Sequence, residues 1–259
     1  MGKFPDYQNK YSRAVLDRRD GILEIRLHTD GGPLVWDEPA HTELADLFND
    51  VALDRDNRVV ILTGTGDSFC ATIKPNSFLF LSHPQGLDRI VNEGRRMFNA
   101  LLAIEAPVIA AINGPVRVHP EIPVLSDIVI AADTTVIQDS PHFISGVVPG
   151  DGCNIVWTEL LGMNRGRYFL LTGEEIDAAE AQRLGVVGEV VPLEEVLPRA
   201  WELAQRIAAN SDLTLRYSRI ILTEKWRKRF TEELGFGMML AGSAINDLMN
   251  ASGSPFKDS

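Results

Sequence analysis

Apolar runs alternate along this chain with stretches of helical periodicity, and this alternation limits the fold more than any other feature. Residues 59–63, 108–112 and 128–131 are almost entirely apolar, as in strands buried on both faces of a sheet. An alternating pattern at 21–27 and a short run at 188–191 predict two more strands. Because strands separated by helices pair through crossover connections, we predict an α/β fold with a substantially parallel, buried sheet.

Helical periodicity fills the intervals, at residues 41–52, 87–103, 155–161, 165–171, 178–184 and 196–209. After about residue 213 only helical patterns remain, and they end in a polar tail at 252–259. A chain of 259 residues, 45% of them hydrophobic, is long enough to bury one main core. We therefore expect a core at residues 1–200 and a helical C-terminal region at 201–259.

Composition and charge exclude several classes of function. The net charge of −11 repels phosphate backbones, so we expect no nucleic-acid partner. No apolar run approaches the roughly 18 residues of a membrane helix, and the N-terminal segment lacks the apolar centre of a signal peptide. We therefore expect a soluble, cytoplasmic protein without a membrane partner. Cys70 and Cys153 are too few for a disulfide framework or a cysteine zinc site.

The chain has no complete cofactor or metal motif. Gly64 and Gly66 follow a predicted strand, but Phe69 stands where a dinucleotide-binding loop needs its third glycine. His119 and Glu121 could donate metal ligands, but no second pair of ligands is clustered with them. Phosphate-binding loops, serine-hydrolase elbows and zincin motifs are absent from the sequence. We expect neither a cofactor nor a metal.

Trp36 and His41 flank the start of the first long predicted helix. His41 shares a helical face with the apolar Leu44 and Phe48, so its side chain is predicted to point inward. Trp36 is predicted to lie in the loop between strand and helix, where α/β proteins place binding residues. Each has a plainer interpretation, a core aromatic for Trp36 and a hydrogen-bonded inward histidine for His41.

Segments 64–73, 111–123 and 138–152 resemble, in order and spacing, the strand-end loops of the crotonase (enoyl-CoA hydratase/isomerase) superfamily. The likeness extends from about Asp20 to Pro192. It implies a crotonase-type ββα superhelix core with a helical C-terminal trimerisation region, and hence a homotrimer or a dimer of trimers. It also implies an oxyanion hole for substrate, whose first donor is the N–H of Ile73 and whose second falls at His119.

The departures from the superfamily pattern concern the residues that carry its chemistry. Val118, His119 and Pro120 replace a run of glycines, and His142 stands where hydratases have a catalytic glutamate. The second hydratase glutamate is expected near Glu121 or Ile122, in a loop that is one residue shorter. The paired carboxylates that add water to an enoyl double bond are therefore not assured.

The chain most resembles a narrower branch, the β-diketone hydrolases of the 6-oxocamphor hydrolase type, which use no coenzyme A. The residues that carry this likeness are Trp36, His41, the segment 119–123, His142 and Asp151. The resemblance implies hydrolysis of a carbon–carbon bond in a cyclic β-diketone, a retro-Claisen reaction that yields a keto acid. One departure is that residues 238–242 of the C-terminal helix offer no carboxylate to the pocket.

The chemistry of this reaction suggests a role for each residue. A histidine of ordinary pKa, near 6.5, can take and return a proton at neutral pH, so His142 is the expected general base and Asp151 the partner that fixes its tautomer. His119 and the indole of Trp36 would donate hydrogen bonds to the substrate oxygen or enolate. His41 would shape the pocket. A coenzyme-A-dependent hydratase, isomerase or thioesterase is the alternative enzyme, and a non-catalytic scaffold or RNA-binding protein is the third possibility.

Overall fold

The computed structural model describes residues 2–252, and its centre is a six-stranded sheet. The strand order is β1 (Ala14–Arg19), β2 (Ile22–Leu27), β4 (Val59–Thr63), β6 (Val108–Ile112), β7 (Ile128–Ala132) and β10 (Glu189–Val191). Only the β1–β2 pair is antiparallel within this sheet, and the other neighbours are parallel. The prediction of a parallel-dominated α/β sheet is confirmed.

Short strands form a second layer beside the main sheet. β3 (Leu34–Trp36) pairs in parallel with β5 (Cys70–Ile73), and β8 (Val136–Ile137) pairs with β9 (Ile176–Asp177). Isolated bridges join Val116 to both Cys70 and Ile137. β3, β5 and β8 each follow a strand of the main sheet, and Val116 follows β6, so the layer holds the segments that leave the carboxyl ends of β2, β4, β6 and β7. β9 joins this layer after α6. This repeated ββα arrangement matches the crotonase fold.

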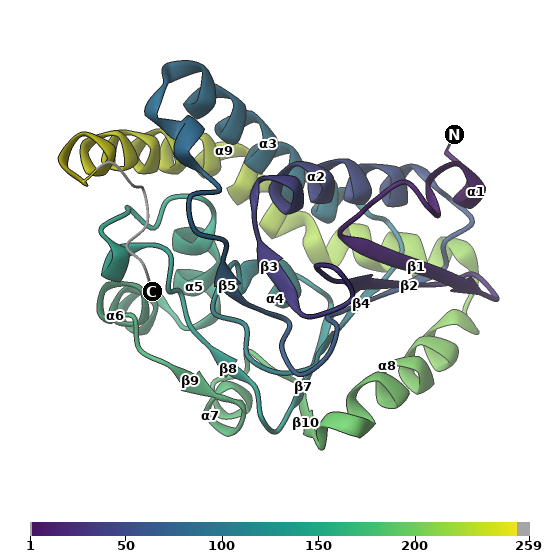
Figure 1. The fold of residues 1–259 in the computed structure, drawn as a ribbon. Coiled ribbons are helices and arrows are strands. Elements are labelled where there is room, and N and C mark those ends of the chain that lie inside the picture. Colours follow the sequence, from purple (N-terminus) through teal and green to yellow (C-terminus); the bar gives the residue numbers. More distant parts are fainter. Residues whose placement is uncertain (1, 253–259) are drawn as a thin grey trace.

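Helices surround both layers (Figure 1). They are α1 (Phe4–Tyr7), α2 (Glu38–Leu53), α3 (Pro84–Ala103), α4 (Glu121–Val124), α5 (Cys153–Leu160), α6 (Met163–Thr172), α7 (Ala178–Arg183), α8 (Leu193–Ala208) and α9 (Asp212–Ser252), with 3-10 turns η1 (Leu79–Ser82) and η2 (Phe143–Ser145). α8 covers one face of the sheet, where Ile61 and Ile109 pack against Leu203. α2, α3 and α9 contribute to the core on the other side. Strands covered on both faces have no polar side, which explains the fully buried runs of β4 and β6.

Two local devices bring the site loops into position. Asp37 caps α2 by accepting a hydrogen bond from the N–H of Ala40 at 2.9 Å, so the chain turns into the helix directly after Trp36. Trp36 therefore ends β3 instead of lying in a loop. Asn113, after β6, accepts from the N–H of Gly64 at 3.1 Å and donates to the carbonyl of Gly66 at 2.9 Å. This amide ties the loop after β6 to the loop after β4.

The C-terminal part of the described chain is one helix of 41 residues, α9. Arg219 is buried on α9, where it forms an ion pair with Asp127 and donates to the carbonyl of Ile104 at 2.7 Å. Of the polar tail expected at 252–259, Ser252 ends α9 and residues 253–259 lie outside the described residues. The boundary between a core at residues 1–200 and a helical C-terminal region at 201–259 stays a prediction. Over the described range, no helix combines the length and apolar character needed to cross a membrane.

Candidate active site

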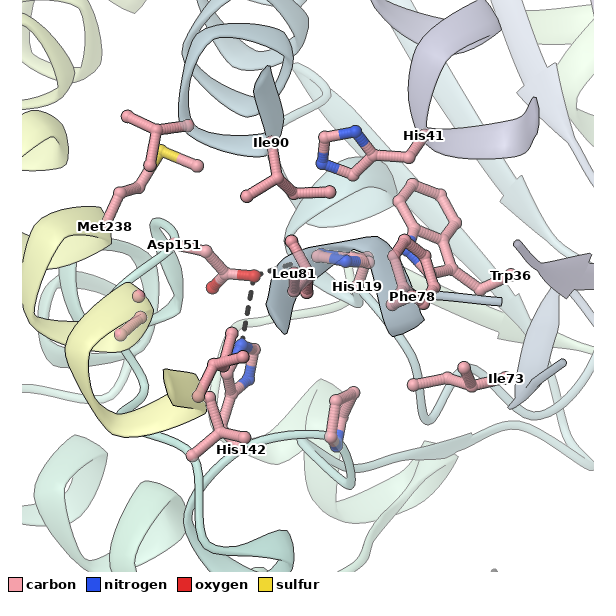
Figure 2. A pocket seen from close by; sticks show the side chains of 16 residues that line it. Trp36, His41, Ile73, Phe78, Leu81, Ile90, His119, His142, Asp151 and Met238 are labelled. Carbon is pink, nitrogen blue, oxygen red and sulfur yellow. Dashed lines mark ion pairs between the residues drawn. The ribbon is translucent and has the colours of Figure 1, made fainter. Parts of the chain in front are cut away.

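One cavity brings together the side chains proposed from the sequence (Figure 2). Trp36 comes from β3, His41 from α2, His119 from the segment before α4, and His142 and Asp151 from the connection between β8 and α5. Trp36 lies between two of the histidines, with its ring centroid 4.2 Å from that of His119 and 5.9 Å from that of His41. The indole of Trp36 therefore contacts the rings of both His41 and His119 in the cavity wall.

Apolar side chains form the remainder of the wall. Ile73 of β5 lies beside Trp36, its partner in the β3–β5 pair, and Leu81 of η1, Ile90 of α3 and Met238 of α9 enclose the other sides. The space between these side chains, counted together with the solvent at its mouth, is ≈ 640 Å³. Among the residues that the structure describes, no lysine or arginine lines this cavity, and α9 contributes no carboxylate to it. The cavity therefore suits a neutral, largely apolar ligand.

His142 lies between two carboxylates. Its Nδ1 is 2.6 Å from Oδ1 of Asp139, and its Nε2 is 3.0 Å from Oδ2 of Asp151 (Figure 2 shows the second contact). The His142 side chain is 7% exposed, that of Asp139 is fully buried and that of Asp151 is 16% exposed. The expected pairing of His142 with Asp151 is present, but a second aspartate occupies the other ring nitrogen.

A tight turn holds His142 in this orientation. Its carbonyl accepts hydrogen bonds from the N–H groups of Ser145, at 2.8 Å, and Val147, at 3.0 Å. The hydroxyl of Ser145 donates to the carbonyl of Ser140, and the hydroxyl of Ser140 donates to the carbonyl of Arg117. The backbone on both sides of His142 is therefore fixed to itself and to the neighbouring loop.

The contacts of His142 with Asp139 and Asp151 shift the pKa values of His142 and Asp151. Burial disfavours an imidazolium, but the carboxylates of Asp139 and Asp151 outweigh burial and raise the pKa of His142 well above its ordinary value. Burial also opposes ionisation of Asp151, yet His142, with a smaller contribution from His119, holds the pKa of that carboxyl below its usual range. The pKa of His142 is therefore higher than the ordinary value expected from the sequence, and the contacts favour an imidazolium paired with a carboxylate.

His119 has a left-handed backbone, with φ of +48°. This is the conformation that glycine adopts most easily, at the place where the superfamily has its glycine run. Its Nδ1 lies 3.5 Å from Oδ2 of Asp151 and 3.7 Å from Oε2 of Glu121. The loop has kept a glycine-like turn while adding a ring that reaches the cavity.

Glu121 is turned away from the cavity. Its side chain is fully buried, and its Oε1 accepts a hydrogen bond from the indole N–H of Trp157 at 3.0 Å. Burial raises the pKa of Glu121 despite the opposing effect of His119, and the nearby carboxylates of Asp151 and Asp139 add to the rise. Glu121, which stands close to the second hydratase glutamate, is therefore bonded to Trp157 instead of facing a ligand.

His41 is held from behind by Glu93 of α3. Its Nδ1 is 3.1 Å from Oε2 of Glu93, which also accepts from the hydroxyl of Thr42, and Arg89 donates to Oε1 at 2.8 Å. Burial lowers the pKa of His41 despite the carboxylate. Burial likewise opposes the charge of Glu93, but His41 and Arg89 lower its pKa to about 2. Burial thus favours the neutral form of His41, in which Nδ1–H donates to Glu93.

Asp139, Glu93 and the orientation of Glu121 were not anticipated as parts of the site. Asp139 stands three residues before His142, a spacing that could have suggested a partner in a turn, whereas Glu93 is 52 residues from His41. The N–H of Ile73 as an oxyanion donor and the donor roles of His119 and Trp36 stay predictions.

One buried cluster has the residue types of a metal site. Possible ligand atoms of Asp139, His142 and Cys153 lie within 4.8 Å of one another. However, the hydrogen bond between His142 and Asp139 already uses two of these atoms, and burial raises the pKa of the Cys153 thiol well above its ordinary value. The cluster is better described as a hydrogen-bonded group around His142.

Comparison with known proteins assigns the chain to a family. The model of the enoyl-CoA hydratase/isomerase family matches residues 17–253. The chain belongs to this family, which is the crotonase superfamily that its loops resemble. The probable enoyl-CoA hydratase echA8 of Mycobacterium tuberculosis is 31% identical over 238 residues, covering 91% of this chain and 90% of that protein.

Two further relatives differ in how much of their length is matched. The probable mitochondrial enoyl-CoA hydratase of Dictyostelium discoideum is 29% identical over 184 residues, 71% of this chain and 65% of that protein. A solved structure of a β-diketone hydrolase from the cyanobacterium Anabaena sp. PCC 7120, bound to (S)-3-oxocyclohexyl acetic acid, is 44% identical with a TM-score of 0.93. That match covers 95% of this chain and 99% of the cyanobacterial one.

Proposed function

We propose that this protein is a hydrolase that cleaves a carbon–carbon bond of a cyclic β-diketone and needs no cofactor. The observation that carries the proposal is the pair of His142 and Asp151, joined at 3.0 Å in the wall of an apolar cavity. A histidine paired with a carboxylate can activate water. The second carbonyl of a 1,3-diketone accepts the electrons of the broken bond, so no further group is required.

The proposed reaction adds one water to one diketone. The reactive form is the one in which Nε2 of His142 has lost its proton to solvent, and in this form His142 takes a proton from water as the oxygen bonds to one carbonyl carbon. His119 and Trp36 donate hydrogen bonds to the resulting oxyanion or to the enolate that follows. The oxyanion then collapses to a carboxylic acid, the carbon–carbon bond breaks, and its electron pair forms the enolate of the other ketone. His142 returns its proton to the enolate carbon, leaving a keto acid.

The ligand of the cyanobacterial relative supports this chemistry. (S)-3-oxocyclohexyl acetic acid is a keto acid. If its carboxyl carbon is joined to the ring carbon that adjoins the ketone on the side away from the side chain, with loss of water, the result is a bridged bicyclic 1,3-diketone. A product of that kind is expected from the proposed reaction. The neutral, apolar cavity also suits the diketone better than it suits a charged substrate.

A coenzyme-A-dependent hydratase, isomerase or thioesterase is the second candidate, because the curated relatives above are named enoyl-CoA hydratases. Two features argue against it. Glu121 is hydrogen-bonded to Trp157 and does not line the cavity, and His142 stands at the position of the other hydratase carboxylate.

A panel of cyclic 1,3-diketones tests the proposal. Purified protein should consume at least one of them, seen as loss of the 1,3-dicarbonyl absorbance, and the product mass should equal the substrate plus one water. His142→Ala is the matched control, and enoyl-CoA and acyl-CoA substrates are assayed in parallel. Turnover of a coenzyme A substrate with none of the diketones would favour the second candidate.

We also propose that the protein forms a homotrimer or a dimer of trimers through α9. The helix exposes several large apolar side chains, with Ile221 at 74%, Leu222 at 70% and Phe236 at 72%. An apolar surface of this kind is a common mark of a protein interface. Light scattering after size-exclusion chromatography tests it, and a mass equal to one chain of 28.6 kDa would contradict it.

A further inference from the structure

The two carboxylates beside His142 differ in what else they can reach. Asp151 lines the cavity, and its Oδ2 is also 3.5 Å from Nδ1 of His119. Asp139 does not line the cavity, and its side chain is fully buried behind His142. Its contact with the ring is nevertheless the shorter of the two, at 2.6 Å compared with 3.0 Å. Asp139 can therefore influence a ligand only through His142.

We propose that Asp139 is a positioning residue that keeps the Nδ1 of His142 protonated and makes Nε2 the only ring nitrogen that exchanges protons during the reaction. This inference rests on the proposed function for its kinetic consequences. The hydrogen bond on which it depends can be tested without any substrate.

The assignment of the tautomer follows from the chemistry of the acceptor. A carboxylate only accepts hydrogen bonds, so a ring nitrogen 2.6 Å from it carries the proton. The thiol of Cys153 is 3.8 Å from the same nitrogen and is the only other polar group recorded against it among the described residues. The second carboxylate oxygen, Oδ2 of Asp139, is buried without a hydrogen-bond partner in the described part of the chain. The charge of Asp139 is therefore directed mainly to His142.

Within the part of the chain that the structure describes, the titratable groups near His142 are Asp139 and Asp151 on its two nitrogens, Cys153 from α5, and His119, whose ring centroid is 6.4 Å from that of His142. α9 faces the cavity with apolar residues, including Met238 and Ile245. Asp139 and Asp151 thus supply the negative charge in contact with the ring.

In this arrangement Asp139 and Asp151 have different roles. The proton taken from water goes to Nε2, on the side of Asp151 and the cavity, and it leaves from Nε2 to the enolate carbon. The Nδ1 proton stays in its bond to Asp139 throughout. The sequence predicts that Asp151 fixes the tautomer of His142. Under this proposal Asp139 fixes it, and Asp151 lies where it can contact the water.

The variant Asp139→Asn tests the kinetic consequences of the proposal. The variant keeps the shape of the side chain but removes its charge, so kcat should fall about 10²-fold or more while KM changes little. His142 acts as a base only after losing its Nε2 proton, and the charge of Asp139 opposes that loss. The ascending limb of the pH profile of kcat should therefore move to lower pH in Asp139→Asn.

Asp133→Asn is the matched control. Asp133 is exposed and lies in the connection between β7 and β8, six positions before Asp139. It undergoes the same chemical change without touching His142, so its pH profile and kcat should equal those of the wild type. In a His142→Ala background, Asp139→Asn should cause little further loss, because its effect passes through the missing ring.

Proton NMR of the substrate-free protein tests the hydrogen bond itself. A short bond from an imidazole N–H to a carboxylate gives a strongly deshielded proton signal. This signal should be present in the wild type and in Asp151→Asn, and absent from His142→Ala. That comparison does not require Asp139→Asn to fold, and it remains valid if the protein hydrolyses no diketone.

Two results would overturn the inference. One is loss of the deshielded signal in Asp151→Asn, which would place the bond on the wrong nitrogen. The other is an Asp139→Asn protein that loses activity while its pH profile stays at the wild-type position, which would indicate a purely structural role. A protein with the expected signal but no diketone activity would contradict the proposed function alone.

Discussion

Gly150 and Gly237 meet backbone to backbone. A Cβ atom at Gly150 would lie 2.2 Å from the carbonyl oxygen of Gly237, and one at Gly237 would lie 2.3 Å from that of Gly150. Gly150 directly precedes Asp151, and Gly237 directly precedes Met238 on α9. The contact therefore fixes the position of the Asp151 carboxylate relative to the helix that forms the opposite wall.

Gly237→Ala should separate the Asp151 loop from α9. We expect a loss of about 1–3 kcal/mol in the free energy of unfolding, typical of overpacking, together with a fall in kcat. Gly235→Ala is the matched control, because the nearest atom to its Cβ would be Nε of Arg95 at 4.0 Å. In that variant the better helix propensity of alanine should raise stability by about 0.5–1 kcal/mol. Thermal melts of the two variants check this, and equal stabilities would contradict it.

Loss of the proposed base should abolish most of the diketone activity. His142→Ala and Asp151→Asn are each expected to lower kcat by about 10²–10⁴-fold. Because the two residues act as a unit, the double variant should be little worse than the poorer single one. Steady-state kinetics on any diketone that the wild type consumes provide the measurement, and fully additive effects would refute the idea of a shared proton.

Removal of the His119 ring should weaken stabilisation of the oxyanion. His119→Ala is expected to reduce kcat by about 10²–10³-fold, as for other single donors to an oxyanion. His119→Gly keeps the left-handed backbone accessible and provides a comparison free of strain at that φ. If both variants retain wild-type kcat, His119 is not a donor in the reaction.

The Glu93 and His41 pair should make stability depend on pH in the acid range. The pKa of Glu93 is lowered to about 2 in the folded protein, from its ordinary value of 4.5. Its stabilising charge is therefore fully present above pH 4.5 and is lost as the pH falls toward 2. Wild type should be more stable than Glu93→Gln at neutral pH, and the difference should shrink between pH 4.5 and 2. Urea denaturation at several pH values checks this, and a difference independent of pH would contradict it.

The main sheet was predictable because its strands are buried on both faces. The runs at 59–63 and 108–112 correspond to β4 and β6 at both ends, and the helix predicted at 41–52 is the inner part of α2. β3, β5, β8 and β9 were missed, since strands of two to four residues have too few positions to show a period. The antiparallel β1 was also missed, because its mixed polar sequence shows only partial burial.

The cavity residues were predicted by type and resemblance, but their mutual contacts were not. Trp36, His41, Ile73, His119, His142 and Asp151 all line one cavity, as expected. The partners that decide protonation, Asp139 and Glu93, have no motif of their own, and Glu93 reaches His41 only because α2 and α3 pack side by side. A pKa depends on such contacts, so the raised pKa of His142 could not be read from the sequence.

The absence of lysine and arginine from the described cavity wall bears on what happens after the bond is broken. The proposed substrate is neutral, but the proposed product ionises to a carboxylate beside Asp151. Like charges at close range repel strongly where water is scarce. The imidazolium of His142, already shared by two carboxylates, offers little compensation. The cavity wall that admits the neutral diketone therefore also favours release of the charged keto acid. Accumulated keto acid should inhibit the enzyme only weakly.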